Sequence, residues 1–169
     1  MTKREGENVT LHCNATGNPL PTLSWTKDGS DIANNHRISI SEDKKQLAIT
    51  IANREHRGGY LCVAHNEVGN DSLIIAILDV QYRPEIASHP QIVTKPEGEN
   101  VTLTCNATGN PEPELLWFKD YEHLERSSNR ISLSAGNKSL MIANLNRTNS
   151  GKYLCVAQNE VGNATSNIT

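Results

Sequence analysis

The feature that most restricts the fold of this chain is a stretch that occurs twice. Glu5–Pro19 has the sequence EGENVTLHCNATGNP, and Glu97–Pro111 has the sequence EGENVTLTCNATGNP. A second repeated stretch follows each copy: Tyr60–Asn70 is YLCVAHNEVGN, and Tyr153–Asn163 is YLCVAQNEVGN. Self-similarity of this extent indicates one folding unit used twice, so every local pattern has to make sense in both copies.

The length and the repeat together predict two small domains. A chain of 169 residues suits this division, and the repeat places the domains at residues 1–82 and 83–169. The sequence continues further past Asn70 than past Asn163, and the stretch before the second copy has no counterpart before the first. We therefore expect part of a longer chain, with the first strand of domain 1 truncated and the last strand of domain 2 a candidate for truncation.

The four cysteines fall two in each copy. Pairing Cys13 with Cys62, and Cys105 with Cys155, is the arrangement that gives both copies the same internal bond. Closing a loop of about 50 residues should stabilise each domain by roughly 4 kcal/mol. The alternative is four free buried thiols, as in intracellular versions of such a module.

Short strands account for most of each copy. Asn8–Asn14 alternates between apolar and polar residues, which is typical of a half-buried strand. Further strands are predicted at 22–27, 38–40, 47–51, 58–66 and 72–80, and the Gly-, Pro- and Asn-rich stretch 16–21 is predicted as a loop. No segment has a helical period. The sequence thus predicts an all-β protein with two antiparallel β-sandwiches in tandem.

The order Cys, Trp, Tyr, Cys in each copy predicts the core. An inward tryptophan should pack on each disulfide, and a tyrosine two residues before the second cysteine should form a tyrosine corner. These core residues are Trp25, Tyr60, Trp117 and Tyr153.

Both copies resemble immunoglobulin domains of the I-set. The resemblance rests on Gly17-Asn18-Pro19 and Gly109-Asn110-Pro111, on a Trp-x-Lys-Asp run in each copy, and on the pattern Gly-x-Tyr-x-Cys-x-Ala-x-Asn that begins at Gly58 and at Gly151. It covers nearly the whole chain. It implies an extracellular recognition module of a cell-adhesion molecule or a receptor, with a receptor tyrosine kinase ectodomain among the candidates. A structural spacer in a matrix or muscle-type protein is the alternative, because this fold serves many unrelated functions.

One position departs from the I-set pattern. The family has an Asp two residues before the Gly of the Gly-x-Tyr-x-Cys run, and this Asp pairs with an Arg. Arg37 and Arg130 are present, but His56 and Asn149 stand at the Asp positions. We expect the pair to be weakened in both domains.

Composition and motif content exclude several other functions. The net charge is −3 and the basic residues are scattered, so no stripe could follow a nucleic-acid backbone. The six histidines do not show the spacing of a metal motif, and no catalytic constellation appears. We predict no cofactor, no metal and no enzymatic activity in this segment, although a kinase elsewhere in the parent chain stays open. The longest apolar run is too short to span a bilayer, so a membrane anchor of the parent chain would lie outside these residues.

Asn-x-Ser/Thr motifs are frequent, and together with paired cysteines they favour an extracellular or cell-surface glycoprotein. The alternative is an Asn-rich composition without glycans. The candidate sites are Asn8, Asn14, Asn70, Asn100, Asn106, Asn137, Asn146, Asn163 and Asn167. Alternation puts those around the first cysteine of each copy on the outer face of one sheet.

The other sheet, made of strands C, F and G of the immunoglobulin scheme, is predicted to be apolar on its outer face. With Tyr60 and Cys62 inward, their neighbours point outward, and contiguous exposed apolar area is typical of an interface. The alternative is isolated surface residues without a function. The candidates are Leu61, Val63, Ile75, Ile77, Leu116, Phe118, Leu154 and Val156. The expected partner is a protein, with a second copy of this chain as one candidate.

Overall fold

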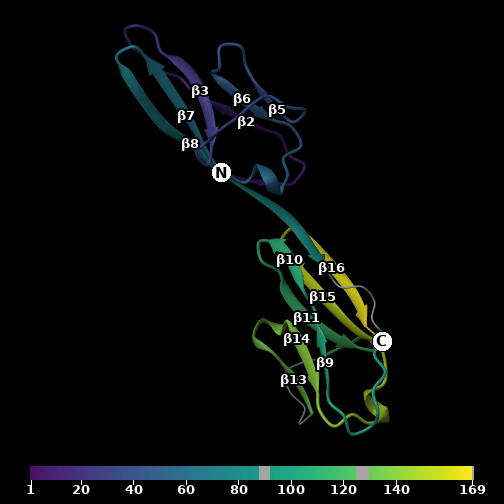
Figure 1. Ribbon diagram of the computed structural model, residues 1–169. Coiled ribbons are helices and arrows are strands. Elements are labelled where there is room, and N and C mark those ends of the chain that lie inside the picture. Colours follow the sequence, from purple (N-terminus) through teal and green to yellow (C-terminus); the bar gives the residue numbers. More distant parts are fainter. Residues whose placement is uncertain (88–91, 125–129, 169) are drawn as a thin grey trace. The chain divides into compact units, whose positions relative to one another are not determined.

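A computed structural model describes residues 1–87, 92–124 and 130–168, and it divides the chain into unit 1 (Met1–Gln81) and unit 2 (Tyr82–Thr169) (Figure 1). Each unit contains two β-sheets, and the remaining regular structure consists of short 3-10 turns. The predicted all-β class with two sandwiches is therefore confirmed.

Unit 1 pairs its strands in two sheets. The first has the order β1-β8-β7-β3-β4 and the second the order β2-β6-β5; β1 runs parallel to β8 and the other neighbours are antiparallel. Alternation builds the core, because Val9 and Leu11 of β2 are buried while Thr10 between them is exposed. The elements are β1 (Thr2–Arg4), β2 (Val9–His12), β3 (Thr22–Lys27), β4 (Ser30–Asp31), β5 (Ile38–Ile40), β6 (Gln46–Ile49), η1 (Arg54–His56), β7 (Gly58–Asn66) and β8 (Gly69–Ile86), which begins in this unit and ends in unit 2.

Unit 2 repeats this arrangement with one addition. Its two main sheets have the orders β12-β11-β15-β16 and β13-β14-β9, and in addition β10 pairs with the Tyr82–Ile86 part of β8. Its elements are β9 (Val101–Thr104), β10 (Ala107–Asn110), β11 (Glu114–Lys119), β12 (Glu122–His123), β13 (Ile131–Leu133), η2 (Ala135–Asn137), β14 (Ser139–Ile142), η3 (Arg147–Asn149), β15 (Tyr153–Asn159) and β16 (Gly162–Ile168). The strand β10 corrects one expectation. The predicted loop 16–21 has an equivalent stretch in unit 2, and the first residues of that stretch belong to β10 instead of a loop.

The disulfides join Cys13 to Cys62 and Cys105 to Cys155, one inside each unit, which is the pairing that the repeat favours. Trp25 lies opposite Cys62 in the β3–β7 register and belongs to the same buried cluster. Trp117 lies opposite Cys155 in the same way. A tryptophan beside each disulfide therefore forms the centre of each core.

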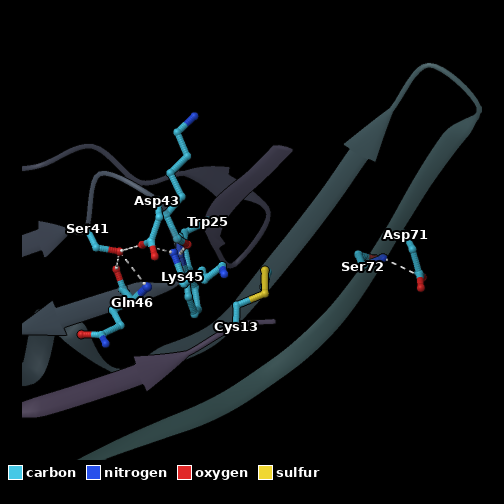
Figure 2. Close-up of a disulfide and its surroundings, with 10 residues drawn as sticks. Cys13, Trp25, Ser41, Asp43, Lys45, Gln46, Asp71 and Ser72 are labelled. Carbon is cyan, nitrogen blue, oxygen red and sulfur yellow. Dashed lines mark hydrogen bonds between the residues drawn. A yellow bond between two sulfur atoms is a disulfide. The ribbon is translucent and has the colours of Figure 1, made fainter. Parts of the chain in front are cut away.

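The indole nitrogen of each tryptophan donates a hydrogen bond to a backbone carbonyl in a turn. Trp25 Nε1 donates to the Lys44 carbonyl at 2.8 Å, within the turn of residues 41–46 that Figure 2 shows near Cys13. In this turn the Ser41 hydroxyl and the Lys45 amide both donate to the Asp43 carboxylate, the hydroxyl at 2.6 Å. The Ser41 hydrogen bond, and after it the Lys45 one, lowers the pKa of Asp43. The turn is thus tied both to itself and to the core.

Tyrosine corners complete both cores. Tyr60 Oη donates to the His56 carbonyl at 2.8 Å, and Tyr153 Oη donates to the Asn149 carbonyl at 2.7 Å. Burial, and after it the charge of Asp28, raises the pKa of Tyr60 to about 12. The tyrosine therefore stays a neutral donor across the physiological range.

His56 and Asn149, at the positions where the I-set pattern has Asp, cap the short turns η1 and η3. His56 Nδ1 accepts from the Asn53 amide at 3.0 Å, and Asn149 Oδ1 accepts from the Asn146 amide at 3.0 Å. Arg37 donates to the Ile51 carbonyl at 3.1 Å. The side chains of His56 and Asn149 therefore supply the acceptor that the capping box of each turn needs.

The capping acceptor is a titratable histidine in unit 1, His56, and a neutral amide in unit 2, Asn149. This difference predicts that stability depends on pH through this site in unit 1 and not in unit 2. Burial, and after it the charge of Arg37, lowers the pKa of His56 below 6.5; Lys27 adds to this, while the Asn53 amide and Glu55 oppose it. The unfolded chain then binds a proton more readily than the folded one. Unit 1 should have the full contribution of this site above pH 6.5 and lose it as the pH falls from 6.5 toward the lowered folded-state pKa.

The measurement is urea unfolding between about pH 7.5 and about pH 5, followed by Trp25 fluorescence in a Trp117→Phe background. The matched control is His56→Asn, which copies unit 2. An equal loss of stability in wild type and His56→Asn would contradict the assignment to His56.

Candidate recognition face

The candidate face of unit 1 is the outer side of β3, β7 and β8, here called the β3-β7-β8 face. Leu61 and Val63 on β7 are half-buried there, because Tyr60 and Cys62 occupy the inward positions. Ile77 on β8 is 68% exposed. The structure thus places three of the four predicted unit 1 residues on one face.

The fourth, Ile75, differs from the expectation. The β7–β8 register shifts between Tyr60 and Leu61, since Tyr60 lies opposite Ala76 whereas Leu61 lies opposite Ile74. Ile75 is the extra residue of this irregularity, and it packs partly buried against the unit 1 core. Ile74 takes the exposed place opposite Leu61.

The sequence could not indicate this change of phase. Leu73–Leu78 is an unbroken apolar run, so a one-residue shift leaves no trace in the pattern. As a result Ile74, opposite Leu61, is on the β3-β7-β8 face and is 60% exposed, whereas Leu73 lies opposite the inward Cys62. Ile74 and Ile77 together form an apolar strip on β8 that is more exposed than the half-buried residues of β7.

A groove of about 460 Å³ lies beside this strip, lined in part by Gly58, Gly59, Leu61, Ile74 and Ile77. Gly58 has a φ of +147°, and a Cβ there would collide with the Asp28 carboxylate. The position therefore requires glycine, and the absence of side chains at both glycines leaves the floor of the groove low.

Charges of both signs stand at the rim of the groove. The Asp28 carboxylate accepts from the Gly59 amide at 2.7 Å and from Lys27 Nζ at 2.9 Å. The Gly59 hydrogen bond, and after it the Lys27 one, lowers the pKa of Asp28. Arg57 Nε lies 3.2 Å from an Asp79 carboxylate oxygen. An apolar strip with a mixed-charge rim has the layout of a protein-binding patch.

On the matching face of unit 2, formed by β11 and β15, the predicted apolar residues are less exposed than Ile74 and Ile77 of unit 1. Leu116 lies opposite Val156 and Phe118 opposite Leu154, and all four are half-buried. The Phe118 ring also contacts His123, with centroids 5.1 Å apart. These predicted residues shield one another as cross-strand pairs.

One exposed aromatic residue of unit 2 was not predicted. Tyr121 is 86% exposed in the turn between β11 and β12 and has a φ of +74°. The positive φ at a bulky residue was not visible in the sequence pattern.

The candidate glycosylation sites differ in accessibility. Exposed side chains are found at Asn8, Asn14, Asn70, Asn100, Asn106, Asn163 and Asn167, whereas Asn137 and Asn146 are half-buried. Asn137 is the least suitable, because its Nδ2 donates to the Leu115 carbonyl at 2.8 Å and its carbonyl receives Trp117 Nε1. A glycan on that nitrogen would require the hydrogen bond to Leu115 to break.

Two kinds of site were searched over the described residues. Within residues 1–87, 92–124 and 130–168, no group of three or more His, Cys, Asp or Glu side chains could hold a metal ion. Over the same residues, no helix is long and apolar enough to cross a membrane.

Comparison with known proteins places these features in context. The family model described as "Immunoglobulin I-set domain" matches residues 1–78 and residues 84–169. Hemicentin-2 of Mus musculus is 37% identical over 171 residues, which cover 96% of this chain and 3% of that protein. Neural cell adhesion molecule 1 of Mus musculus is 32% identical over 173 residues, covering 93% of this chain and 15% of that protein.

Among solved structures, the chain is similar to one in the complex of Dpr2 Ig1-Ig2 with DIP-Theta Ig1-Ig3. The identity is 29%, the TM-score is 0.76, and the match covers all of this chain (100%) and 60% of that chain. The sequence thus spans only a small part of the two curated relatives named above, and most of the solved chain.

Proposed function

Because this chain belongs to the immunoglobulin I-set family, we propose that it is an extracellular protein-recognition module of a cell-surface adhesion molecule or receptor. It contacts its partner through the β3-β7-β8 face of unit 1 and the corresponding face of β11 and β15 in unit 2. The partner to be tested first is a second copy of the chain.

The observation that carries this proposal is the apolar strip on β8. Ile74 and Ile77 are 60% and 68% exposed, on one strand and beside a groove that both of them line. Soluble proteins rarely leave neighbouring branched apolar side chains in water without a function for them. The half-buried Leu61 and Val63 extend the strip onto β7.

The opposite sheet is suited to carry glycans instead of a partner. Asn8 and Asn14 flank β2 and are exposed, and Asn100 and Asn106 flank β9 in the same way. Asn8 Oδ1 accepts from the Ile51 amide at 3.0 Å, which holds the side chain by its oxygen and leaves its nitrogen as the site of attachment. Glycans at these positions would leave the β3-β7-β8 face uncovered.

Two disulfides, together with an adhesion molecule among the relatives, support an extracellular or cell-surface location, where such bonds persist.

The proposal is tested by placing charges on the strip. The double variant Ile74→Lys/Ile77→Lys should weaken self-association at least about tenfold, because each buried isoleucine contributes roughly 1.5–3 kcal/mol. Both side chains are exposed, so the unfolding midpoint should stay unchanged. Self-association is measured as molecular mass against concentration by analytical ultracentrifugation. Phe118→Asp tests the face of unit 2 in the same assay.

The matched control is Leu20→Lys, since Leu20 is 78% exposed but lies outside the β3-β7-β8 face. Equal association of Ile74→Lys/Ile77→Lys and the control would contradict the proposed face. A wild type that stays monomeric at high concentration would contradict self-recognition.

A further inference from the structure

Two of the candidate glycosylation motifs lie at the recognition faces themselves. Asn70 is the second residue of β8, and Asn163 is the second residue of β16, the strand beside β15. They occupy the same place in the repeat, within Asn70-Asp71-Ser72 and Asn163-Ala164-Thr165, and both match the acceptor pattern for N-linked sugars. Both side chains are exposed. Each unit therefore presents an accessible acceptor at the same point of its sheet.

In unit 1 the strand register turns Asn70 onto the β3-β7-β8 face. Asn70 lies opposite His65 of β7, and directly opposite residues of an antiparallel pair point to the same side of the sheet. His65 is exposed and shares the outward side with Val63, since Cys62 is buried and side chains alternate along a strand. At about 3.3 Å per residue, Asn70 stands about 13 Å along β8 from Ile74. A glycan on Asn70 would therefore begin on the proposed contact face.

In unit 2 the register does the same for Asn163. It lies opposite Gln158 of β15, which is exposed, whereas the neighbouring Ala157 is buried. Thr165, the hydroxyl residue of the same motif, lies opposite Val156 on this side of the sheet. Asn163 is about 7 Å from Thr165 along the strand. The acceptor thus stands beside the predicted contact residues of β15.

The side chain of Asn70 is held in a way that suits attachment. Its Oδ1 is hydrogen-bonded to His65 Nδ1 across the two strands. This contact uses the amide oxygen, whereas the sugar is attached to the amide nitrogen, Nδ2. On Asn137, by contrast, Nδ2 itself is engaged by the Leu115 carbonyl. A sugar can therefore be added to Asn70 without breaking the bond to His65.

We propose that Asn70 and Asn163 carry N-glycans that cover the recognition faces, so that occupancy of these two sites regulates association. This regulation rests on the function proposed above. Attachment joins Nδ2 to C1 of the first sugar of a lipid pyrophosphate-linked oligosaccharide; the C1–O bond of the donor breaks, Nδ2 loses a proton and the lipid pyrophosphate leaves. The glycan is bulky and hydrophilic, and it takes the space in which a second copy would pack on Ile74.

The first experiment measures occupancy and its effect on association. The chain is secreted from eukaryotic cells, and glycopeptide mass spectrometry should find sugars on Asn70 and on Asn163. The variant Asn70→Gln/Asn163→Gln should associate at least about tenfold more tightly than the glycosylated wild type, because it can bury apolar side chains that the glycans cover. Association is measured by analytical ultracentrifugation.

The matched control is Asn14→Gln/Asn106→Gln. These two asparagines are also counterparts in the repeat, are exposed and follow β2 and β9 of the opposite sheets. Removing their sugars should leave association at the wild-type level. Unoccupied Asn70 and Asn163 in the secreted chain would overturn the proposal, and so would equal association of the two double variants when the unglycosylated chain associates.

A second readout does not depend on association. Hydroxyl-radical labelling of dilute protein, detected by mass spectrometry after the sugars are removed, should be lower at Ile74 in the wild type than in Asn70→Gln/Asn163→Gln. Ile51, which is 58% exposed and follows β6 of the opposite sheet, is the internal control and should not change. Equal labelling of Ile74 in both chains would overturn the proposal, even for a chain that is always monomeric. A monomeric unglycosylated chain with shielded Ile74 in the wild type would instead contradict self-recognition alone.

Discussion

The double variant Cys105→Ala/Cys155→Ala should lose roughly 4 kcal/mol of unfolding free energy in unit 2, because the disulfide closes a loop of about 50 residues. Both cysteines are fully buried in the unit 2 core, so the substitution also leaves small voids around Trp117. A domain of this size has little stability beyond that amount. Unit 2 should therefore be largely unfolded near 37 °C.

The measurement is urea unfolding with exchange protection resolved for each unit. The control is Cys13→Ala/Cys62→Ala, which should move the loss to unit 1 and leave unit 2 folded, since each bond lies inside one unit. If either variant unfolded both units together, the division into two independently stapled modules would be wrong. Titration of the unreduced wild type should detect no thiol.

The second large effect is expected from Trp117→Ala. Trp117 is fully buried, lies opposite Cys155 and donates from Nε1 to the Asn137 carbonyl at 2.8 Å. Removing it should cost about 3–5 kcal/mol through the cavity that remains. The loss of the indole donor also leaves the Asn137 carbonyl without this hydrogen bond.

Tyr121→Ala is the matched control in the same unit, because this aromatic side chain is 86% exposed. It should change the unfolding free energy by less than about 0.5 kcal/mol. Calorimetry on both variants checks the comparison. Similar losses in the two would show that Trp117 is not the centre of the core.

Much of the fold followed from the sequence because the information was local or duplicated. The repeat defined the module, and one cysteine pair in each copy left a single pairing that treats both alike. Period-2 alternation located strands such as Thr22–Lys27 and Gly58–Asn66 with the bounds that the structure has. Alternation works there because one face of the strand is buried and the other is not.

The candidate face was predictable only in part. Leu61, Val63 and Ile77 could be assigned to it by counting from Cys62 and Leu78, both of which are buried. Ile75 could not, because the irregularity beside Leu61 depends on how β7 and β8 pair and not on the apolar run itself. Apolar residues at every position of a strand carry no phase.

The effect of tertiary structure on local structure is clearest in one tetrapeptide. Ala15–Asn18 and Ala107–Asn110 have the same sequence, Ala-Thr-Gly-Asn, yet only the second is a strand, β10. In unit 2 these residues pair with the Tyr82–Ile86 part of β8, and in unit 1 they pair with no described strand. A strand exists when its backbone groups find a partner edge, and four residues cannot specify that edge. The sequence by itself therefore determined the module, its disulfides and most of its inward residues, whereas the pairing of edges decided where strands form and which apolar residues face water.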